Sequence, residues 1–264
     1  MANMNERYER VWKKWEHEDL GRQIIAHRKS RIKYLDLIIK YLAKGNKLKA
    51  LEVGCGAAID LHIIAEGCEA EMFGIDISQE AFVIARKIQQ YFSKKVYLAL
   101  GDVRNLEFAD DSFDMVFSQG LIEHFETPIY VLREQVRVLK PGGVLIVNVP
   151  QKYTVYTLYK HLMALLGRWE WGNEKEYSSG QLKRFGDYLE LEFLEKCGYD
   201  YWRSLFEIVF ILKTLNRKME KIPFVKDCPG QKTISRFWER SWERLEGLYG
   251  HLFMKNVIYV YRKP

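Results

Sequence analysis

The chain has 264 residues, 48% of them hydrophobic, enough for one large α/β domain with a buried core and some additions. Its four cysteines show no Cys-x-x-Cys spacing, so we expect reduced thiols in a cytoplasmic protein and no metal site. The first 20 residues are dense in charge and no apolar run approaches about 20 residues, so neither a signal peptide nor a membrane span is predicted.

The net charge of +6 is concentrated near the N-terminus. Residues 1–49 hold 13 Lys and Arg against 6 Asp and Glu, whereas the remainder holds 28 against 29. A basic helical segment usually presents a solvated face, and binding to an acidic partner is its less frequent use.

Two helices are predicted before the first strand, over 5–20 and 28–43, and we expect residues 1–45 to form an N-terminal helical cap. The first helix carries a stripe of Tyr8, Val11, Trp12 and Trp15. Such a stripe more often packs on the domain that follows it, here residues 46–264; the alternative is that it closes over a ligand.

The next segment reads as a strand, a tight turn and a helix start. The apolar run at 50–53 includes Glu52 and breaks into Gly54 and Gly56, and an amphipathic stretch follows from Ile59. Glycines accept positive φ and let a ligand approach the backbone. Ile59 excludes the dinucleotide pattern G-x-G-x-x-G, and no Gly-Lys-Ser/Thr follows, which excludes a P-loop.

Acidic residues follow the next two predicted strands. Asp76 ends the strand at 71–78, 22 positions after Gly54, where an acid can accept hydrogen bonds from ribose hydroxyls. Ser78 is placed to cap the helix predicted at 79–90. Asp102 follows the strand that begins at Lys95; it could accept from an exocyclic amine such as that of adenine, or it could be only a turn residue.

A fourth strand (111–118), a helix (128–139), a turn (140–143) and a fifth strand (144–149) complete the alternation of strands and helices. The sheet should therefore be largely parallel, with ligands at its carboxyl edge.

Five segments in this order resemble the class I S-adenosylmethionine-dependent methyltransferases, in particular the branch that includes the ubiquinone- and menaquinone-biosynthesis enzymes. They are Glu-Val-Gly-Cys-Gly, Gly-Ile-Asp, Gly-Asp-Val, Phe-Asp-Met-Val-Phe…Glu-His and Leu-Lys-Pro-Gly-Gly. The match covers about residues 46–150. One departure is Ala58, where many members have a third glycine.

The resemblance implies a Rossmann-like, mostly parallel seven-stranded sheet with helices on both faces and an antiparallel last strand. It also implies S-adenosyl-L-methionine as cofactor, with S-adenosyl-L-homocysteine as product. The matching cofactor positions are Glu52, Gly54, Cys55, Gly56, Asp76, Ile77, Asp102, Val103 and Gln119.

Each position has an implied role. Glu52 and the glycine backbone would hold the methionine part, and Asp76 the ribose. Ile77 would lie on the adenine, Asp102 and Val103 at the adenine edge, and Gln119 beside the sulfonium.

His124 is the candidate catalytic base for an acceptor that must lose a proton, because imidazole titrates near neutrality. The alternative is a structural role under the cofactor pocket, since enzymes of many substrate types share the Glu-His pair.

Helical additions are expected after the fifth strand, at about 151–180 and 207–253. The first carries aromatic residues from Tyr153 to Trp171, and the second a stripe from Trp238 to Leu252. Segments 176–182 and 191–199 resemble the family's helix and its approach to the sixth strand, and 256–261 its closing antiparallel strand.

An aromatic-lined cleft suits a small, partly apolar acceptor, so the first hypothesis is a small-molecule methyltransferase acting on an O, N or C nucleophile. The alternatives are a methyltransferase of a macromolecule, tRNA or protein, and a non-catalytic cofactor-binding or membrane-surface protein.

Overall fold

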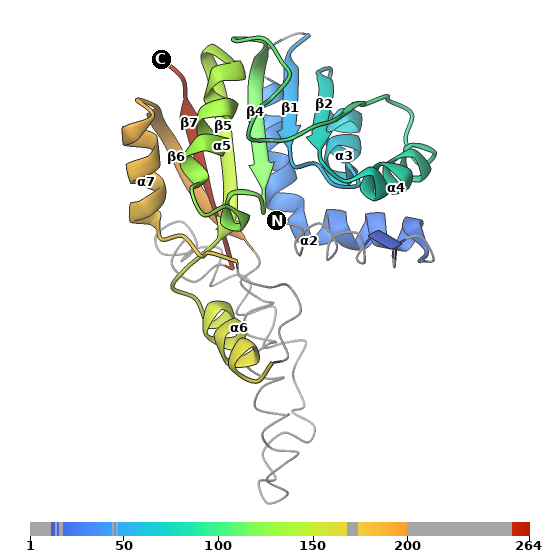
Figure 1. Ribbon diagram of the computed structural model, residues 1–264. Helices are drawn as coiled ribbons and strands as arrows, with labels where there is room; N and C mark the ends of the chain where they lie inside the picture. Colours follow the sequence, from blue (N-terminus) through green and yellow to red (C-terminus); the bar gives the residue numbers. More distant parts are fainter. Residues whose placement is uncertain are drawn as a thin grey trace, which may run out of the picture.

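The computed structural model describes residues 12–13, 15, 18–43, 45, 47–167, 174–199 and 255–264. These form one seven-stranded sheet in the order β3-β2-β1-β4-β5-β7-β6 (Figure 1). The strands are β1 (Lys49–Val53), β2 (Glu71–Asp76), β3 (Tyr97–Leu100), β4 (Phe113–Gln119), β5 (Leu139–Pro150), β6 (Glu192–Tyr199) and β7 (Asn256–Arg262). Strands β1 to β5 pair in parallel, and β7 is antiparallel to both β5 and β6, which confirms the predicted sheet.

Helices cover both faces of this sheet. The helices are α2 (Leu20–Leu42), α3 (Ile59–Gly67), α4 (Gln79–Gln89), the short 3-10 helix η1 (Ile122–His124), α5 (Pro128–Val138), α6 (Val155–Leu165) and α7 (Ser179–Tyr188). The apolar side chains of α2, α3 and α4 pack on one face of the sheet, and those of α5 and α7 pack on the other. The arrangement is therefore three layers, helix on sheet on helix.

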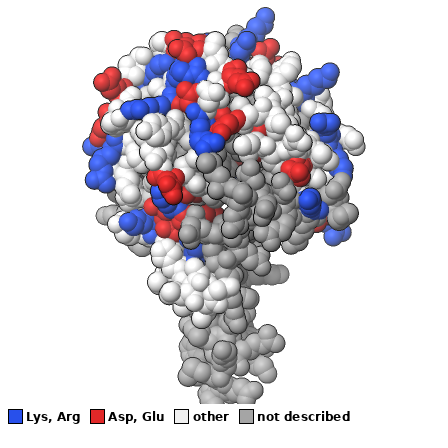
Figure 2. Space-filling view, in the orientation of Figure 1, with Lys and Arg blue, Asp and Glu red and all other residues white. Residues whose placement is uncertain are grey.

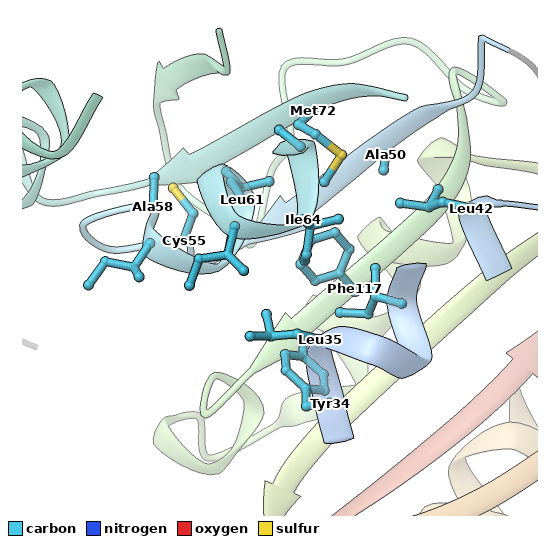
Figure 3. Packing of buried hydrophobic residues seen from close by; sticks show 14 of the residues in the cluster. Tyr34, Leu35, Leu42, Ala50, Cys55, Ala58, Leu61, Ile64, Met72 and Phe117 are labelled. Carbon is cyan, nitrogen blue, oxygen red and sulfur yellow. The ribbon is translucent and has the colours of Figure 1, made fainter. Parts of the chain in front are cut away.

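The alternation of side chains along the strands separates the two cores. In β1, Ala50 points to the core under α2 and α3, and Leu51 and Val53 point to the opposite core. Figure 3 shows the first core, where Tyr34 and Leu35 of α2 lie beside the α3 and β4 side chains. Burial on both faces explains why the parallel strands read as nearly continuous apolar runs.

The N-terminal helices differ in extent from the prediction. Helix α2 begins at Leu20, eight residues before the predicted start, because the Asp19 side chain accepts a hydrogen bond from the Arg22 N–H and caps the helix there. Of the helix predicted at 5–20, Trp12 and Trp15 are described, with their ring centroids 5.5 Å apart and packed against the core under α2. Trp12 and Trp15 therefore pack on the domain.

The turn predicted at 140–143 is instead an irregularity within β5. The register between β4 and β5 shifts from the Phe113–Leu139 pair to the Met115–Val144 pair, so the intervening residues bulge out of the ladder. Gly142 lies in this bulge with φ +76° and makes the conformation possible. The strand before and after it continues in the same direction.

Helix α6 has an unusual polarity. Its inward face carries Thr157, whose hydroxyl donates to the Gln151 carbonyl, and Lys160, which donates to the Glu174 carbonyl and pairs with Glu176. Its outward leucines are exposed, and the end of α6 is largely white in Figure 2. Polar contacts therefore hold α6 against Gln151, just after β5, and against the segment at 174–176.

Helix α7 starts with a capping box between Ser178 and Gln181. The segment that was expected to approach the sixth strand is that strand itself, β6.

Among the helices of the described ranges, none has both the length and the apolar character that a membrane span requires. The addition predicted at 207–253 lies outside the described residues.

Candidate cofactor and active site

The carboxyl ends of β1, β2 and β4 open into a cavity of about 1040 Å³. All ten residues that the sequence singled out line this cavity, from Glu52 at the end of β1 to His124 in η1. Its volume is at the upper end of what ligand pockets reach, which leaves room for a cofactor and an acceptor together.

The glycine loop after β1 is tied to β2 by its own N–H groups. The Gly54 and Cys55 amides donate to the Ile75 carbonyl at 2.8 and 3.1 Å, and the Gly56 amide donates to Asp76 Oδ2 at 2.8 Å. Gly54 and Gly56 have φ of +76° and +51°. The loop thereby presents a wall without side chains to the cavity.

Ala58 occupies the position of the third glycine in the family pattern. It precedes α3 with φ +57°, in the left-handed region, and its methyl group is fully buried. An alanine tolerates this conformation at a modest cost, which explains how the loop keeps its path without the glycine.

Glu52 is a buried carboxylate whose charge is only partly compensated. The Leu61 N–H, in the first turn of α3, donates to it, whereas Oε2 has no hydrogen-bond partner among the described residues. Burial, and then the neighbouring Asp60 and Asp76 carboxylates, raise the pKa of Glu52 well above its usual value. A cationic ligand in the cavity would compensate the negative charge of Glu52 and its two neighbouring carboxylates.

Side chains of α2 form a hydrogen-bond network with Asp60, the neighbour of Glu52, that the sequence did not reveal. Asp60 accepts from His27 Nε2 and from Arg31 Nη1, both at 2.7 Å, and Arg31 Nη1 also donates to Gln119 Oε1 at 2.8 Å. Burial alone would raise the pKa of Asp60, but the Arg31 guanidinium and His27 outweigh it and hold that pKa well below its usual range. The spacing of His27 and Arg31, four apart on one helix, indicates that the two side chains share a helix face, although it does not indicate their partners.

Asp76 is oriented by backbone groups on both sides. Besides Gly56, the Ser78 amide donates to its Oδ1 at 2.9 Å, and Ser78 caps α4 as predicted. Burial raises the pKa of Asp76, although these amides oppose the shift. The carboxylate is held rigidly at the end of β2, and the half-exposed Ile77 side chain follows it along the cavity wall.

Asp102 has a neighbour that the sequence did not reveal. Arg104 Nε lies 2.9 Å from Asp102 Oδ1, and the two side chains form an ion pair at the cavity edge. This pairing, through the hydrogen bonds from Arg104, lowers the pKa of Asp102. The carboxylate is therefore ionised and oriented, with Val103 buried beside it.

The wall of the cavity near η1 and α5 carries both apolar and acidic side chains. Phe125 and Tyr130 line it together with Glu123 and His124, and Leu121 lies against Gly54 of the glycine loop. Burial lowers the pKa of His124 to about 4, against the effect of a hydrogen bond from its ring to the Gly120 backbone. His124 is accordingly neutral at pH 7.

The donors and acceptors of the cavity fit an adenosyl sulfonium better than a phosphate compound. Carboxylates lie at the ends of β1 and β2 and after β3, whereas Arg31 and Arg104 are already paired with Asp60 and Asp102. The Gly54, Cys55 and Gly56 amides of the loop, which could otherwise bind a phosphate, donate to groups within the protein.

Comparison with known proteins agrees with this geometry. Residues 44–192 match a family model described as a methyltransferase domain. A demethylmenaquinone methyltransferase of Bacillus velezensis is 30% identical over 182 residues, covering 65% of this chain and 76% of the relative.

Two solved structures share the fold. A SAM-dependent methyltransferase of Thermotoga maritima, described as a possible histamine N-methyltransferase, is 18% identical with a TM-score of 0.61 and covers 99% of this chain and 100% of that one. Phosphoethanolamine N-methyltransferase 2 of Haemonchus contortus, in complex with S-adenosyl-L-methionine, is 16% identical with a TM-score of 0.60 and covers 97% and 60%.

The fold and the cavity define a doubly wound α/β protein with a deep cavity at the carboxyl edge of its sheet. The chain belongs to the methyltransferase-domain family, and it is a class I S-adenosylmethionine-dependent methyltransferase that resembles the quinone-biosynthesis enzymes.

Proposed function

We propose that this enzyme moves a methyl group from S-adenosyl-L-methionine to a small, partly apolar acceptor by in-line displacement. The observation that carries the proposal is a cavity lined both by oriented carboxylates after β2 and β3, Asp76 and Asp102, and by the aromatic side chains of Phe125 and Tyr130. In such a reaction the protein contributes mainly alignment and exclusion of water, and a cavity of this depth can supply both.

The cofactor lies, in this proposal, along the ends of β1, β2 and β4. Glu52 receives the ammonium of the methionine part, which would satisfy its unpartnered Oε2. Asp76 accepts from the ribose hydroxyls, and Asp102 from the adenine amine beside Val103. Ile77 covers the adenine face.

Arg31 and Gln119 lie at the same end of the cavity as Glu52, joined by the bond from Arg31 Nη1. We assign Gln119, oriented by this bond, to the neighbourhood of the sulfonium. Residues 1–45 would then act as a cap on the domain at 46–264, because α2 carries His27 and Arg31 over the cavity.

The acceptor proposed here is the reduced, hydroquinone form of demethylmenaquinone or a similar ring. Its support is the activity for which the relatives are named, together with the aromatic side chains of Phe125 and Tyr130 on the cavity wall. The reduced ring is electron-rich and can attack a methyl group, whereas the oxidised ring cannot. Basic and acidic side chains are interspersed on the face in Figure 2, which gives a nucleic-acid acceptor no support there.

The test is methyl transfer itself. Purified protein is incubated with S-adenosyl-L-methionine carrying a CD₃ group and with chemically reduced demethylmenaquinone, and the product is weighed by mass spectrometry. We expect a gain of one CD₃ in place of one hydrogen, together with S-adenosyl-L-homocysteine. Absence of both products from folded protein that binds the cofactor would contradict the proposed acceptor.

His124 is proposed as a positioning residue rather than as the base. Its low pKa makes it a weak proton acceptor, and its ring is held by the Gly120 backbone. His124→Ala should therefore weaken cofactor binding and turnover together. A tenfold or greater loss of turnover with unchanged cofactor affinity would instead support a catalytic role.

A further inference from the structure

Glu123 is a buried carboxyl group on the cavity wall that the sequence patterns left without a role. It is the middle residue of η1, only 3% exposed, and it lines the cavity. Its Oε2 atom has no hydrogen-bond partner among the described residues. An unpartnered carboxyl oxygen in such a place is costly unless a ligand or a proton uses it.

The surroundings of Glu123 come from three parts of the chain: η1, the segment at 174–177 and α6. On its own element, His124 is neutral at pH 7; opposite, Tyr177 donates its hydroxyl to the Ile122 carbonyl at 3.2 Å. The Glu174 carboxyl group also lines the cavity, and Lys160 of α6 donates to the Glu174 backbone carbonyl at 3.0 Å. The Lys175 amide, from the same segment, donates to the Glu123 carbonyl at 3.1 Å, which fixes the backbone of η1.

These groups place Glu123 close to its titration point at physiological pH. Burial raises its pKa to about 8, with a further increase from Glu174 and an opposing decrease from Lys160. A carboxyl group with such a pKa can accept a proton from a substrate and release it again near neutrality. His124, whose pKa is about 4, is less well matched to accepting a proton near neutral pH.

We infer that Glu123 is the catalytic base, and that its Oε2 accepts the proton of a ring hydroxyl on a hydroquinone-like acceptor. This inference rests on the proposed function, because it needs an acceptor in the cavity beside Glu123. A neutral acceptor without an ionisable hydroxyl would leave the carboxyl group without a partner.

In the proposed step, the O–H proton of the acceptor passes to Glu123, and the electron pair left on oxygen increases the electron density at the neighbouring ring carbon. This carbon forms the new C–CH₃ bond while the S–CH₃ bond breaks with its electron pair going to sulfur. The hydrogen of that carbon leaves to water as a proton, the ring becomes aromatic again, and Glu123 returns its proton to the oxygen.

The experiment compares Glu123→Gln with Glu107→Gln, which makes the same chemical change at an exposed residue that does not line the cavity. Three quantities are measured for each variant and for wild type: the affinity for S-adenosyl-L-homocysteine by calorimetry, turnover with reduced demethylmenaquinone from pH 6 to pH 9, and the infrared spectrum over the same range. The band of the protonated Glu123 carboxyl group is the one present in wild type and absent from Glu123→Gln, which separates it from that of Glu52.

We expect wild-type kcat/KM to rise with pH and to level off near pH 8, and the carboxyl band to disappear with a midpoint near the same value. For Glu123→Gln, kcat should fall at least a hundredfold and the infrared band of the carboxyl group should be absent. Its affinity for S-adenosyl-L-homocysteine should stay within threefold of wild type. Glu107→Gln should match wild type in all three.

The inference is overturned if Glu123→Gln keeps more than a tenth of wild-type turnover, or if the band that it removes is already absent from wild type at pH 6. Should Glu123→Gln fail to fold, the pH profile of wild-type turnover decides the matter: a kcat/KM that does not rise between pH 6 and pH 8 would overturn the inference. Wild-type protein that does not bind S-adenosyl-L-homocysteine, or that binds it and leaves the reduced quinone unmethylated, would instead refute the proposed function.

Discussion

Replacing Asp60 by asparagine tests how α2 is held over the cofactor end of the cavity. The Asp60 side chain is 3% exposed and accepts two charge-assisted hydrogen bonds of 2.7 Å, from His27 and Arg31. Asparagine keeps the shape but removes the charge, so Arg31 remains beside a neutral amide. Helix α2 and α3 would lose the one ion-pair network described between them near the cavity.

The magnitude follows from the burial of the network. Breaking a buried ion pair by neutralising one partner typically costs 3–5 kcal/mol. Because the Arg31 side chain is 30% exposed, water replaces part of the lost interaction. We therefore expect the lower end of that range, about 3 kcal/mol of unfolding free energy. With a urea dependence of roughly 3 kcal/mol/M, the midpoint would fall by about 1 M.

The matched control is Asp19→Asn, the same substitution at the start of the same helix. Asp19 pairs with Arg22 in the open, with side chains 58% and 88% exposed, and asparagine caps a helix as well as aspartate does. Its cost should be below about 0.5 kcal/mol. Urea unfolding followed by circular dichroism measures both variants. Equal costs for the two, or less than about 1 kcal/mol for Asp60→Asn, would refute the proposed anchoring role.

Three further predictions concern the glycine loop, the ribose position and a buried histidine. Gly56→Ala should weaken binding of S-adenosyl-L-homocysteine at least about tenfold, because the added Cβ would lie 2.9 Å from the Trp12 ring at a φ of +51°; calorimetry that shows full affinity would refute this. Asp76→Asn should weaken the same binding about 10- to 100-fold through lost charge-assisted hydrogen bonds, whereas the affinity of an exposed-site control, Asp110→Asn, should not change. His62 is buried with neither ring nitrogen bonded in the described structure, and burial lowers its pKa to about 4. The unfolded state therefore binds the proton first, and stability present above pH 6.5 should decline by about 3 kcal/mol as the pH falls to 4. His62→Leu should flatten that decline in unfolding free energy, and an unchanged slope would count against it.

Local patterns were sufficient for the sheet and for most of the cavity wall. Parallel strands end at one edge, so an acid at the end of β2 and a glycine loop after β1 had to meet there, as Asp76 and Gly56 do at 2.8 Å. The same holds for the Ser78 cap, whose partners lie within three residues. Motif spacing encodes such contacts directly.

Contacts between distant segments were not predictable in this way. Arg31 reaches Asp60 and Gln119, which are 29 and 88 positions away, and nothing local to α2 indicates those partners. The bulge in β5 arises from the register between two strands, and the sequence there read simply as a Pro-Gly-Gly turn. Glu123 belonged to a recognised motif, but only its burial without a hydrogen-bond partner distinguishes it from its neighbour His124.

The central claim is that carboxylates at the strand ends form a binding site for an adenosyl sulfonium compound. Isothermal calorimetry with S-adenosyl-L-homocysteine and S-adenosyl-L-methionine on folded wild-type protein tests it most directly. We expect one site per chain for each compound and competition between the two. No heat with either compound, together with binding of a nicotinamide dinucleotide or a nucleoside triphosphate, would contradict it.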